Sequence, residues 1–265
     1  MSRAVSFDAV RAKVAAMEAG GAPAKAALSF GDGRLDEVFP AGGLPLGCWH
    51  EVGGEGLEIE TGAAAGAFVA TVARPLAERG AVVWVMRRGD LYAPGLAGFG
   101  FPADRLIQVR ARDEAQALAA LEDALGAAGV AAAIGEAGAV DLTAGRRLQL
   151  ACERRGATGF LIHRRPFGGP PRKADPDAAT GSGSGSAAAT RWTIAPVLSE
   201  PAPGVPGLGA PRWRADLKRC RGGRPGSWIL EMNDGPYPLR VVARLGDRQL
   251  EAPQPHGLEA RRRAG

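Results

Sequence analysis

The sequence predicts an α/β protein with a doubly wound, mostly parallel sheet that is extended by an antiparallel C-terminal meander. Two patterns predict this class. Between residues 48 and 163, short apolar runs alternate with helical segments, which is typical of right-handed crossovers between parallel strands. After residue 190, apolar residues recur at every second position, as in antiparallel strands with one solvated face. The length of 265 residues suits one large domain.

The first part of the chain is expected to lead into the sheet through an appended helix and a glycine turn. Residues 1–27 are Ala-rich with apolar residues at helical spacing, which predicts an N-terminal helical appendage. A turn at 42–45 then leads into a short strand at 48–52. An Ala-rich helix over 61–80, interrupted by Pro75, follows this strand.

The central part is predicted to supply parallel strands and two capped helices. Its short apolar runs are typical of strands buried on both faces, and they lie at 81–86, 106–109, 130–135 and 159–163. Asp113, followed by Gln116, is typical of a capping box. Asp141 is expected to cap a second helix, which ends at Gly156 and directs its arginines outward.

The C-terminal part has a different pattern. Residues 166–189 are rich in Gly, Pro and Ser, which predicts a long mobile loop. In the second of the strands after it, Trp213, Ala215 and Leu217 are expected to face one way, and Arg212, Arg214 and Lys218 the other. These strands are predicted at 190–197, 212–221, 227–234 and 237–245.

Three regions follow from these patterns. They are an N-terminal helical appendage (1–27), a core (28–251) that includes the mobile loop, and a flexible tail (252–265). The tail contains two prolines and three consecutive arginines, so we expect it to be frayed unless a partner orders it.

The charge of the chain is divided unevenly. Residues 1–140 carry 12 Lys and Arg against 17 Asp and Glu, whereas residues 141–265 carry 21 against 11. A half this basic is compatible with a phosphate backbone or an acidic protein surface as partner. The candidate DNA- or partner-binding residues are cations of this half: Arg164, Arg165, Arg172, Lys173, Arg212, Arg214, Lys218, Arg261, Arg262 and Arg263.

Several classes of protein are excluded by composition. The three cysteines and three histidines are scattered without ligand spacing, so neither a metal site nor a disulfide framework is expected. Stretches without a charged residue, such as 38–50, are too short to span a membrane. No secretory signal is expected at the N-terminus. We therefore expect a cytoplasmic protein with no membrane partner.

A glycine-rich turn follows the first predicted strand, where a nucleotide-binding protein would hold phosphate at a helix N-terminus. The glycines of this degenerate phosphate loop are Gly53, Gly54, Gly56, Gly62 and Gly66. The string G-x-x-x-x-G-K-[ST] is missing, and no lysine occurs between Lys25 and Lys173. The carboxylates of Glu55, Glu58 and Glu60 would repel a phosphate. We expect no bound cofactor, no catalytic residue and no ATPase activity.

Two other polar residues have ordinary interpretations. Glu136 ends a predicted strand, where many α/β proteins hold a metal-binding or basic carboxylate. Without phosphate machinery, we interpret it as a solvated strand-end residue or a helix-capping anion. His50, next to Trp49 in a strand, is expected to be a satisfied core histidine.

Several phrases resemble a known family. LSFGDGRLDEVFPAGGLPLGCWHEVGG is similar to the entry of the RecA recombinase core, and the resemblance covers about residues 28–245. Within that superfamily, LPLGCWHEV, GDLYAPGLAGFG, AVDLTAGRRLQLACERRGATGF and PGLGAPRWRADLKRCRGGRPGSWILE resemble the ImuA family. The resemblance implies a RecA-like fold and a role in SOS-induced translesion synthesis and mutagenesis, at the nucleoid after damage.

The resemblance also implies partners and positions. The implied partners are ImuB, an error-prone DnaE-type polymerase and, as a further candidate, RecA. The Walker A lysine falls within 62–66, the catalytic glutamate near 87–90, and the Walker B aspartate at Gly135 or Glu136; none of the three residue types is retained in place. The second DNA-binding loop falls at 166–189.

Three functions are therefore open. The first is a non-catalytic RecA-like accessory protein that binds partners and, weakly, DNA. The second is a SulA-like inhibitor of cell division in the damage response. The third is a DNA-dependent ATPase, against which the missing lysine argues.

Overall fold

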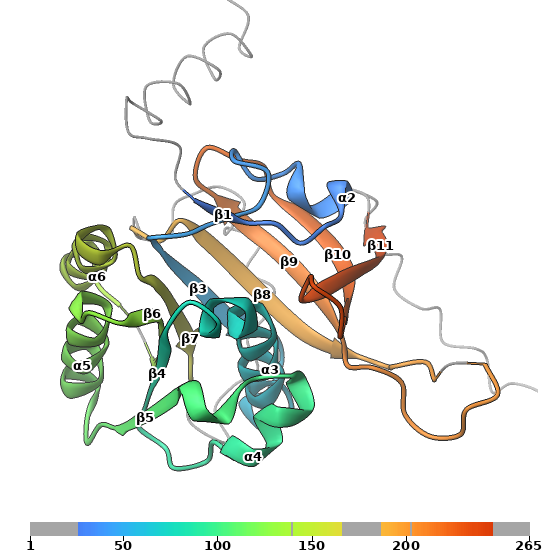
Figure 1. The fold of residues 1–265 in the computed structure, drawn as a ribbon, viewed down its shortest axis with the longest axis horizontal. Helices are drawn as coiled ribbons and strands as arrows, with labels where there is room; N and C mark the ends of the chain where they lie inside the picture. Colours follow the sequence, from blue (N-terminus) through green and yellow to red (C-terminus); the bar gives the residue numbers. More distant parts are fainter. Residues whose placement is uncertain (1–25, 139, 166–186, 202, 246–265) are drawn as a thin grey trace, which may run out of the picture.

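The computed structural model describes residues 26–138, 140–165, 187–201 and 203–245 (Figure 1). The predicted helical appendage, apart from its last two residues, the loop after residue 165 up to residue 186, and the tail lie outside these ranges. So do five candidate cations: Arg172, Lys173, Arg261, Arg262 and Arg263.

The sheet of the described residues has nine strands in the order β11-β10-β9-β8-β3-β7-β6-β4-β5. Strands β8, β3, β7, β6, β4 and β5 run parallel, as the apolar runs predicted. Their bounds are β3 Trp49–Gly54, β4 Ala81–Met86, β5 Leu106–Arg110, β6 Val130–Ala137, β7 Thr158–His163 and β8 Thr190–Val197. These strands confirm the predicted α/β class with a mostly parallel sheet.

The antiparallel extension is also confirmed. β9 (Arg212–Cys220) pairs with β8, β10 (Gly226–Met232) with β9, and β11 (Leu239–Leu245) with β10, all antiparallel. Trp213, Ala215 and Leu217 of β9 are buried, as the alternation predicted. The first strand of the predicted meander, β8, is shared, because it pairs in parallel with β3 on its other side. The extension therefore continues one sheet and one core.

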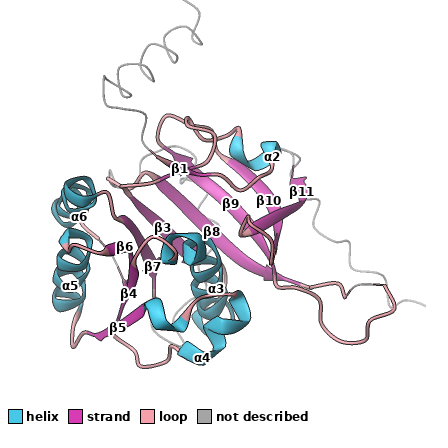
Figure 2. Ribbon diagram, viewed as in Figure 1, coloured by secondary structure: helices cyan, strands magenta, loops and turns pink. Residues whose placement is uncertain are grey.

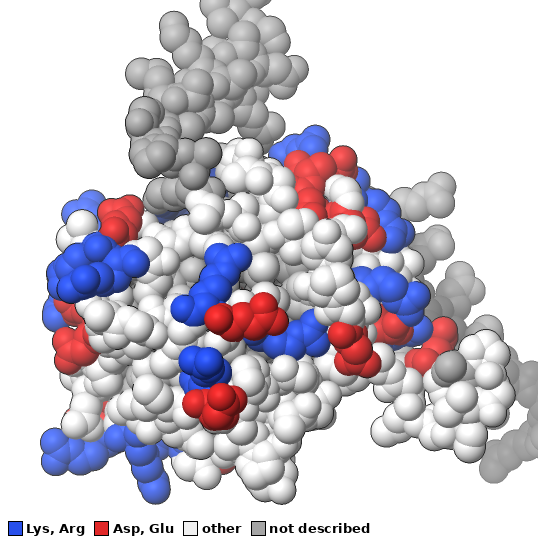
Figure 3. All heavy atoms as spheres, in the orientation of Figure 1, with Lys and Arg blue, Asp and Glu red and all other residues white. Residues whose placement is uncertain are grey.

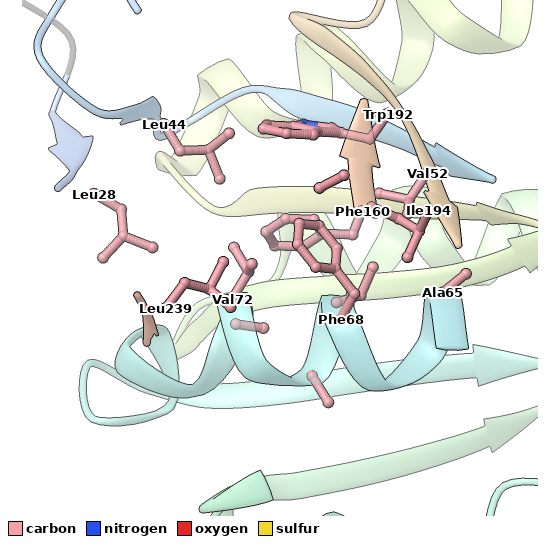
Figure 4. Packing of buried hydrophobic residues seen from close by; sticks show 14 of the residues in the cluster. Leu28, Leu44, Val52, Ala65, Phe68, Val72, Phe160, Trp192, Ile194 and Leu239 are labelled. Carbon is pink, nitrogen blue, oxygen red and sulfur yellow. The ribbon is translucent and has the colours of Figure 1, made fainter. Parts of the chain in front are cut away.

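Helices cover both faces of the parallel part (Figures 1 and 2). α3 (Glu58–Ala77) packs on one face, and α5 (Glu114–Gly126) and α6 (Leu142–Arg155) pack on the other. On the α3 face, Phe68 lies 5.8 Å from Trp192 and 5.9 Å from Trp213, measured between ring centroids (Figure 4). This helix thus ties the parallel strands to the meander.

Helix ends follow the predicted caps. The Asp113 side chain accepts a hydrogen bond from the Gln116 backbone nitrogen at 2.8 Å, and Asp141 caps α6 in the same way. Gly156 ends α6 with φ 76°, a conformation that favours glycine. The smaller helices are α2 (Gly33–Asp36), α4 (Ala93–Leu96), η1 (Ala97–Phe99) and η2 (Ala103–Arg105).

The glycine turn near the N-terminus forms a small second sheet. β1 (Ala27–Leu28) pairs with β2 (Leu44–Pro45). A Cβ on Gly43 would lie 2.5 Å from the Leu28 carbonyl oxygen, so a side chain there would push the two strands apart. The A-G-G-L-P phrase is therefore a packing requirement in this fold.

Three predictions about the strands and helices were wrong. Pro75 was expected to interrupt the first long helix, but α3 continues through Pro75 to Ala77. The run at 106–109 was predicted to be buried on both faces, but β5 is an edge strand and Ile107 is half exposed. The first long helix was predicted to begin at residue 61, but α3 begins at Glu58. Among the described residues, no helix combines the length and apolar character needed to cross a bilayer.

Candidate functional site

The carboxyl ends of β3, β4, β6 and β7 meet at one edge of the sheet, where open α/β folds place their ligand sites. α3 also begins at this edge, directly after β3. Six charged residues converge there, and we call them the strand-end cluster: Glu58, Arg88, Asp90, Glu136, Arg164 and Arg165.

The connection between β3 and α3 is a short turn, residues 55–57. Of the glycines predicted to form a phosphate loop, only Gly56 lies in it, with φ 82°. The other four belong to regular elements: Gly53 and Gly54 to β3, and Gly62 and Gly66 to α3. The predicted glycine-rich loop is therefore corrected to a tight strand-to-helix turn. It lacks the length with which a G-x-x-x-x-G segment wraps its amides around a phosphate.

Glu58, the first residue of α3, lies at the centre of the cluster and is 5% exposed. Its Oε1 lies 3.4 Å from Arg88 Nη1 and 3.4 Å from Arg164 Nε. Its Oε2 accepts a hydrogen bond of 3.2 Å from the backbone nitrogen of Arg165. A carboxylate in the first helical turn is also favoured by the helix dipole. The first turn of α3 thus carries a buried carboxylate of the protein's own, held by arginines from the ends of β4 and β7.

Gly62 is what allows the cluster to approach α3. A Cβ at this position would lie 2.8 Å from Glu58 Oε1 and 2.9 Å from Arg164 Nη1. With a side chain at 62, the ends of the Glu58 and Arg164 side chains would have to shift. Gly62 lies in the segment that the resemblance matched to the Walker A lysine. Its lack of a side chain leaves room for the ion pair between Glu58 and Arg164.

Glu136 extends the cluster toward β6. Its Oε1 accepts a hydrogen bond of 3.0 Å from Trp84 Nε1, and its Oε2 forms an ion pair with Arg164 Nε at 3.2 Å. Burial raises the pKa of the Glu136 carboxyl, and the nearby Arg164 opposes that shift. The interpretation of Glu136 as a solvated strand-end residue was wrong, because β6 carries it under the Arg164 side chain, where it is 5% exposed.

The remaining contacts close the cluster. Arg164 Nη2 lies 2.5 Å from Asp90 Oδ2. Arg88 donates to the backbone carbonyl of Arg165. Three carboxylates thus face three guanidinium groups. The formal charges of the strand-end cluster therefore nearly cancel, and its arginines are already paired with carboxylates of the protein. The structure brings Arg164 and Arg165 together here, as an internal network with Glu58.

Sequence reasoning missed this network, although a signal was present. Arginine pairs follow both β4 (87–88) and β7 (164–165), and parallel strands end at the same edge. Placed beside Glu58 and Glu136, these pairs predict ion pairing at the strand ends. What the pattern could not give is which carboxylate each arginine contacts.

No metal centre was found in the part of the chain that the structure describes, where no three His, Cys, Asp or Glu side chains lie in position to bind one ion. His50 is confirmed as a satisfied core histidine: Nδ1 lies 2.8 Å from Thr190 Oγ1 and Nε2 lies 3.0 Å from the Pro45 carbonyl. Burial lowers its pKa to about 4. Burial also raises the pKa of the Cys152 thiol to about 12, so it stays protonated at neutral pH.

The three described candidate cations of the meander, Arg212, Arg214 and Lys218, are held in ion pairs. Arg212 contacts Glu231 and, at 3.1 Å, Glu200. Arg214 contacts Glu55, and Lys218 lies 3.3 Å from Asp216. Although burial opposes it, hydrogen bonds from Arg240 and Arg212 lower the pKa of Glu231. The positive charges of these three candidate residues are therefore largely neutralised by neighbouring carboxylates.

A second basic surface was not among the candidate residues. Arg146, Arg154 and Arg155 of α6 are exposed, and Figure 3 shows cations gathered over this helix. Arg147 on the same helix pairs with Glu122 at 2.6 Å. The helical spacing after Asp141 had predicted that these arginines point outward, and this is confirmed.

The fold and the site define the class, which is an α/β protein with a mostly parallel sheet and with the protein's own carboxylate, Glu58, at the start of the helix after its first parallel strand. No protein-family model matches the sequence. Protein ImuA of Caulobacter vibrioides, in strains NA1000 / CB15N and ATCC 19089 / CIP 103742 / CB 15, is 57% identical over 258 residues, which cover 94% of this chain and 100% of the relative. The chain belongs to the ImuA family.

A solved structure is also similar. It is a KaiC-like protein of the archaeon Pyrococcus horikoshii OT3, with a TM-score of 0.48 and 14% identity, over 83% of this chain and 100% of that one.

Proposed function

We propose that this chain is a non-catalytic RecA-like accessory protein of SOS-induced translesion synthesis and mutagenesis, which acts by binding protein partners. The resemblance to the ImuA family supplies the pathway and the proposed partners: ImuB, the error-prone DnaE-type polymerase and RecA. DNA is a further, weak ligand in this proposal. The protein acts in the cytoplasm, at the nucleoid after damage.

The observation that carries the non-catalytic part is the position of Glu58. A phosphate bound at the N-terminus of α3 would have to displace a buried carboxylate from contacts with Arg88, Arg164 and the Arg165 backbone. Thr61, the first hydroxyl-bearing residue after β3, donates its hydroxyl to the Leu57 carbonyl at 3.0 Å. Both features favour a nucleotide position that is occupied by the protein itself.

The partner-binding part of the proposal is supported by two exposed surfaces that lie outside the strand-end cluster. A protein that turns over no substrate acts through the surfaces with which it binds other molecules. Assembly of a damage-response complex requires such binding surfaces. The described surface offers an arginine-bearing helix, α6, and a projecting apolar loop between β8 and β9. Neither is part of the strand-end cluster.

Two measurements test the proposal. The first is turnover of radiolabelled ATP by the full chain, with and without single-stranded DNA, for which we expect no turnover above the rate of an Arg164→Ala variant. The second is direct binding of purified ImuB, DnaE-type polymerase and RecA, for which we expect saturable association with at least one. ATP turnover that depends on residues 62–66 would establish a DNA-dependent ATPase instead. Binding to the division protein FtsZ, without binding to the three proposed partners, would establish a SulA-like inhibitor.

A further inference from the structure

The loop between β8 and β9, residues 198–211, projects away from the sheet (Figure 1). Its sequence, LSEPAPGVPGLGAP, carries large apolar side chains that nothing in the described structure covers. Leu198 is 93% exposed, Val205 57% and Leu208 94%. Elsewhere on the described surface no element carries more than two such residues, and the one pair is Leu142 and Leu150 of α6, whereas these three fall within one loop.

The two sides of this loop lie close together at Glu200 and Gly209, which we call the neck. A Cβ on Gly209 would lie 2.0 Å from the carbonyl oxygen of Glu200, so the two sides of the loop touch at a glycine. The Glu200 carboxylate also pairs with Arg212 at 3.1 Å, at the start of β9. The neck thus fixes where the tip leaves the sheet.

The tip has restricted freedom before any partner binds. Pro201, Pro203 and Pro206 have φ fixed near the value of a polyproline II helix. Gly204 and Gly207 have φ 80° and 116° and make the reversals of direction. A segment with fewer conformations loses less entropy when it binds.

The charge of the loop indicates the kind of partner. Glu200 is its only charged residue, and it is engaged at the neck. In Figure 3 the projecting loop is almost entirely uncharged. Without Lys or Arg it has no attraction for phosphates of nucleic acid or of anionic lipid. Proline-rich apolar segments instead suit grooves lined with aromatic side chains on other proteins.

We propose that the tip of the β8–β9 loop, centred on Val205 and Leu208, is a preformed docking element that inserts into an apolar, aromatic-lined groove of a protein partner. The inference rests on the proposed function, because the partner proteins are those named there. It adds the surface by which they are bound. The α6 arginines and the tail are then secondary.

The test compares two matched double variants of the full chain. Val205→Ser with Leu208→Ser removes the apolar tip. Leu142→Ser with Leu150→Ser removes two exposed leucines of α6 and serves as the control. Affinity for purified ImuB, DnaE-type polymerase and RecA is measured for both variants and for wild type. A photo-crosslinking residue at position 208, and one at exposed Tyr92 as control, reports contact directly.

The loop variant is expected to lose affinity by about tenfold or more for the partner that binds wild type. The α6 control should keep it, the thermal melting curves of the three proteins should coincide, and the crosslink should form from 208 and not from 92. Unchanged affinity of the loop variant overturns the inference and leaves the proposed function intact. Failure of wild type to bind any of the three proteins overturns both. A loop variant that loses self-association, or binding to single-stranded DNA or phosphatidylglycerol vesicles, while retaining partner affinity also overturns it.

Discussion

The backbone nitrogen of Arg165, just past the end of β7, donates a hydrogen bond of 3.2 Å to Oε2 of Glu58, the first residue of α3. These two residues are 107 positions apart in sequence. Their contact ties the helix after the first parallel strand to the end of the fifth, at the end of the sheet where open α/β folds place their ligand sites. Four predictions about stability, pH and DNA follow from this and the other contacts of the fold.

Glu58→Ala should destabilise the protein by about 3 kcal/mol, because it removes the buried carboxylate that the guanidinium groups of Arg88, Arg164 and Arg165 share. Urea-induced unfolding followed by circular dichroism measures the free energy of unfolding. Glu78→Ala, an exposed glutamate just past the other end of α3, is the control and should change it by less than about 0.5 kcal/mol. Equal effects of the two substitutions would mean that the strand-end cluster contributes no stability.

Gly62→Ala should destabilise the protein, although alanine in a helix interior is normally favoured over glycine by about 0.5–1 kcal/mol. The added methyl would collide with Glu58 Oε1 and Arg164 Nη1. Gly66→Ala, one turn later in α3, has its nearest neighbour at 3.9 Å and should be neutral or stabilising. Opposite signs for the two variants in thermal unfolding would support the cluster geometry, and a stabilising Gly62→Ala would contradict it.

Stability should fall when the pH is lowered from 7 to 5, because of His50. Its pKa in the folded protein is about 4, below the ordinary value of 6.5, so the unfolded chain takes up a proton that the folded protein refuses. The contribution of neutral His50 to stability is fully present above the pKa of this residue in the unfolded chain. It is lost progressively as the pH falls toward 4. The expected loss between pH 7 and pH 5 is about 2 kcal/mol.

The measurement is urea unfolding at both pH values, with His50→Gln as the variant in which this part of the pH dependence disappears. Nuclear magnetic resonance of the His50 ring provides a second test that needs no substitution. A ring that titrates above pH 6 in the folded protein would refute the prediction.

DNA binding, if it is electrostatic, should depend more on α6 than on the meander. Arg146, Arg154 and Arg155 are exposed, whereas Arg214 and Lys218 are paired with carboxylates. Replacing the three α6 arginines by alanine should lower the slope of log affinity against log salt by about 2 on single-stranded DNA. Arg214→Gln with Lys218→Gln should change the slope less. Fluorescence anisotropy at several salt concentrations decides between them, and an affinity insensitive to salt would contradict both.

Local patterns of the sequence were sufficient for most of the fold. The continuous apolar run at 81–86 became β4 with the predicted bounds, because a strand buried on both faces needs apolar residues at every position. The caps at Asp113 and Asp141 involve residues three positions away, so the signal lies within one helical turn. β5 was placed correctly but its exposure was not, since being at the edge depends on the order of strands in the sheet.

In the candidate site, too, some features follow from local sequence and others depend on contacts between distant parts of the chain. The absence of a phosphate-binding lysine could be read from the sequence alone, but the glycine loop could not, because four of its five glycines belong to β3 and α3. The packing of strands from distant parts of the chain is what pairs Glu58 with Arg164, brings Arg164 close to Gly62 and buries Glu136. The physical reason is that an ion pair depends on distances between side chains from different strands, and these distances are set by strand order and register. Charge at a single position in a sequence specifies neither its partner nor its exposure to water.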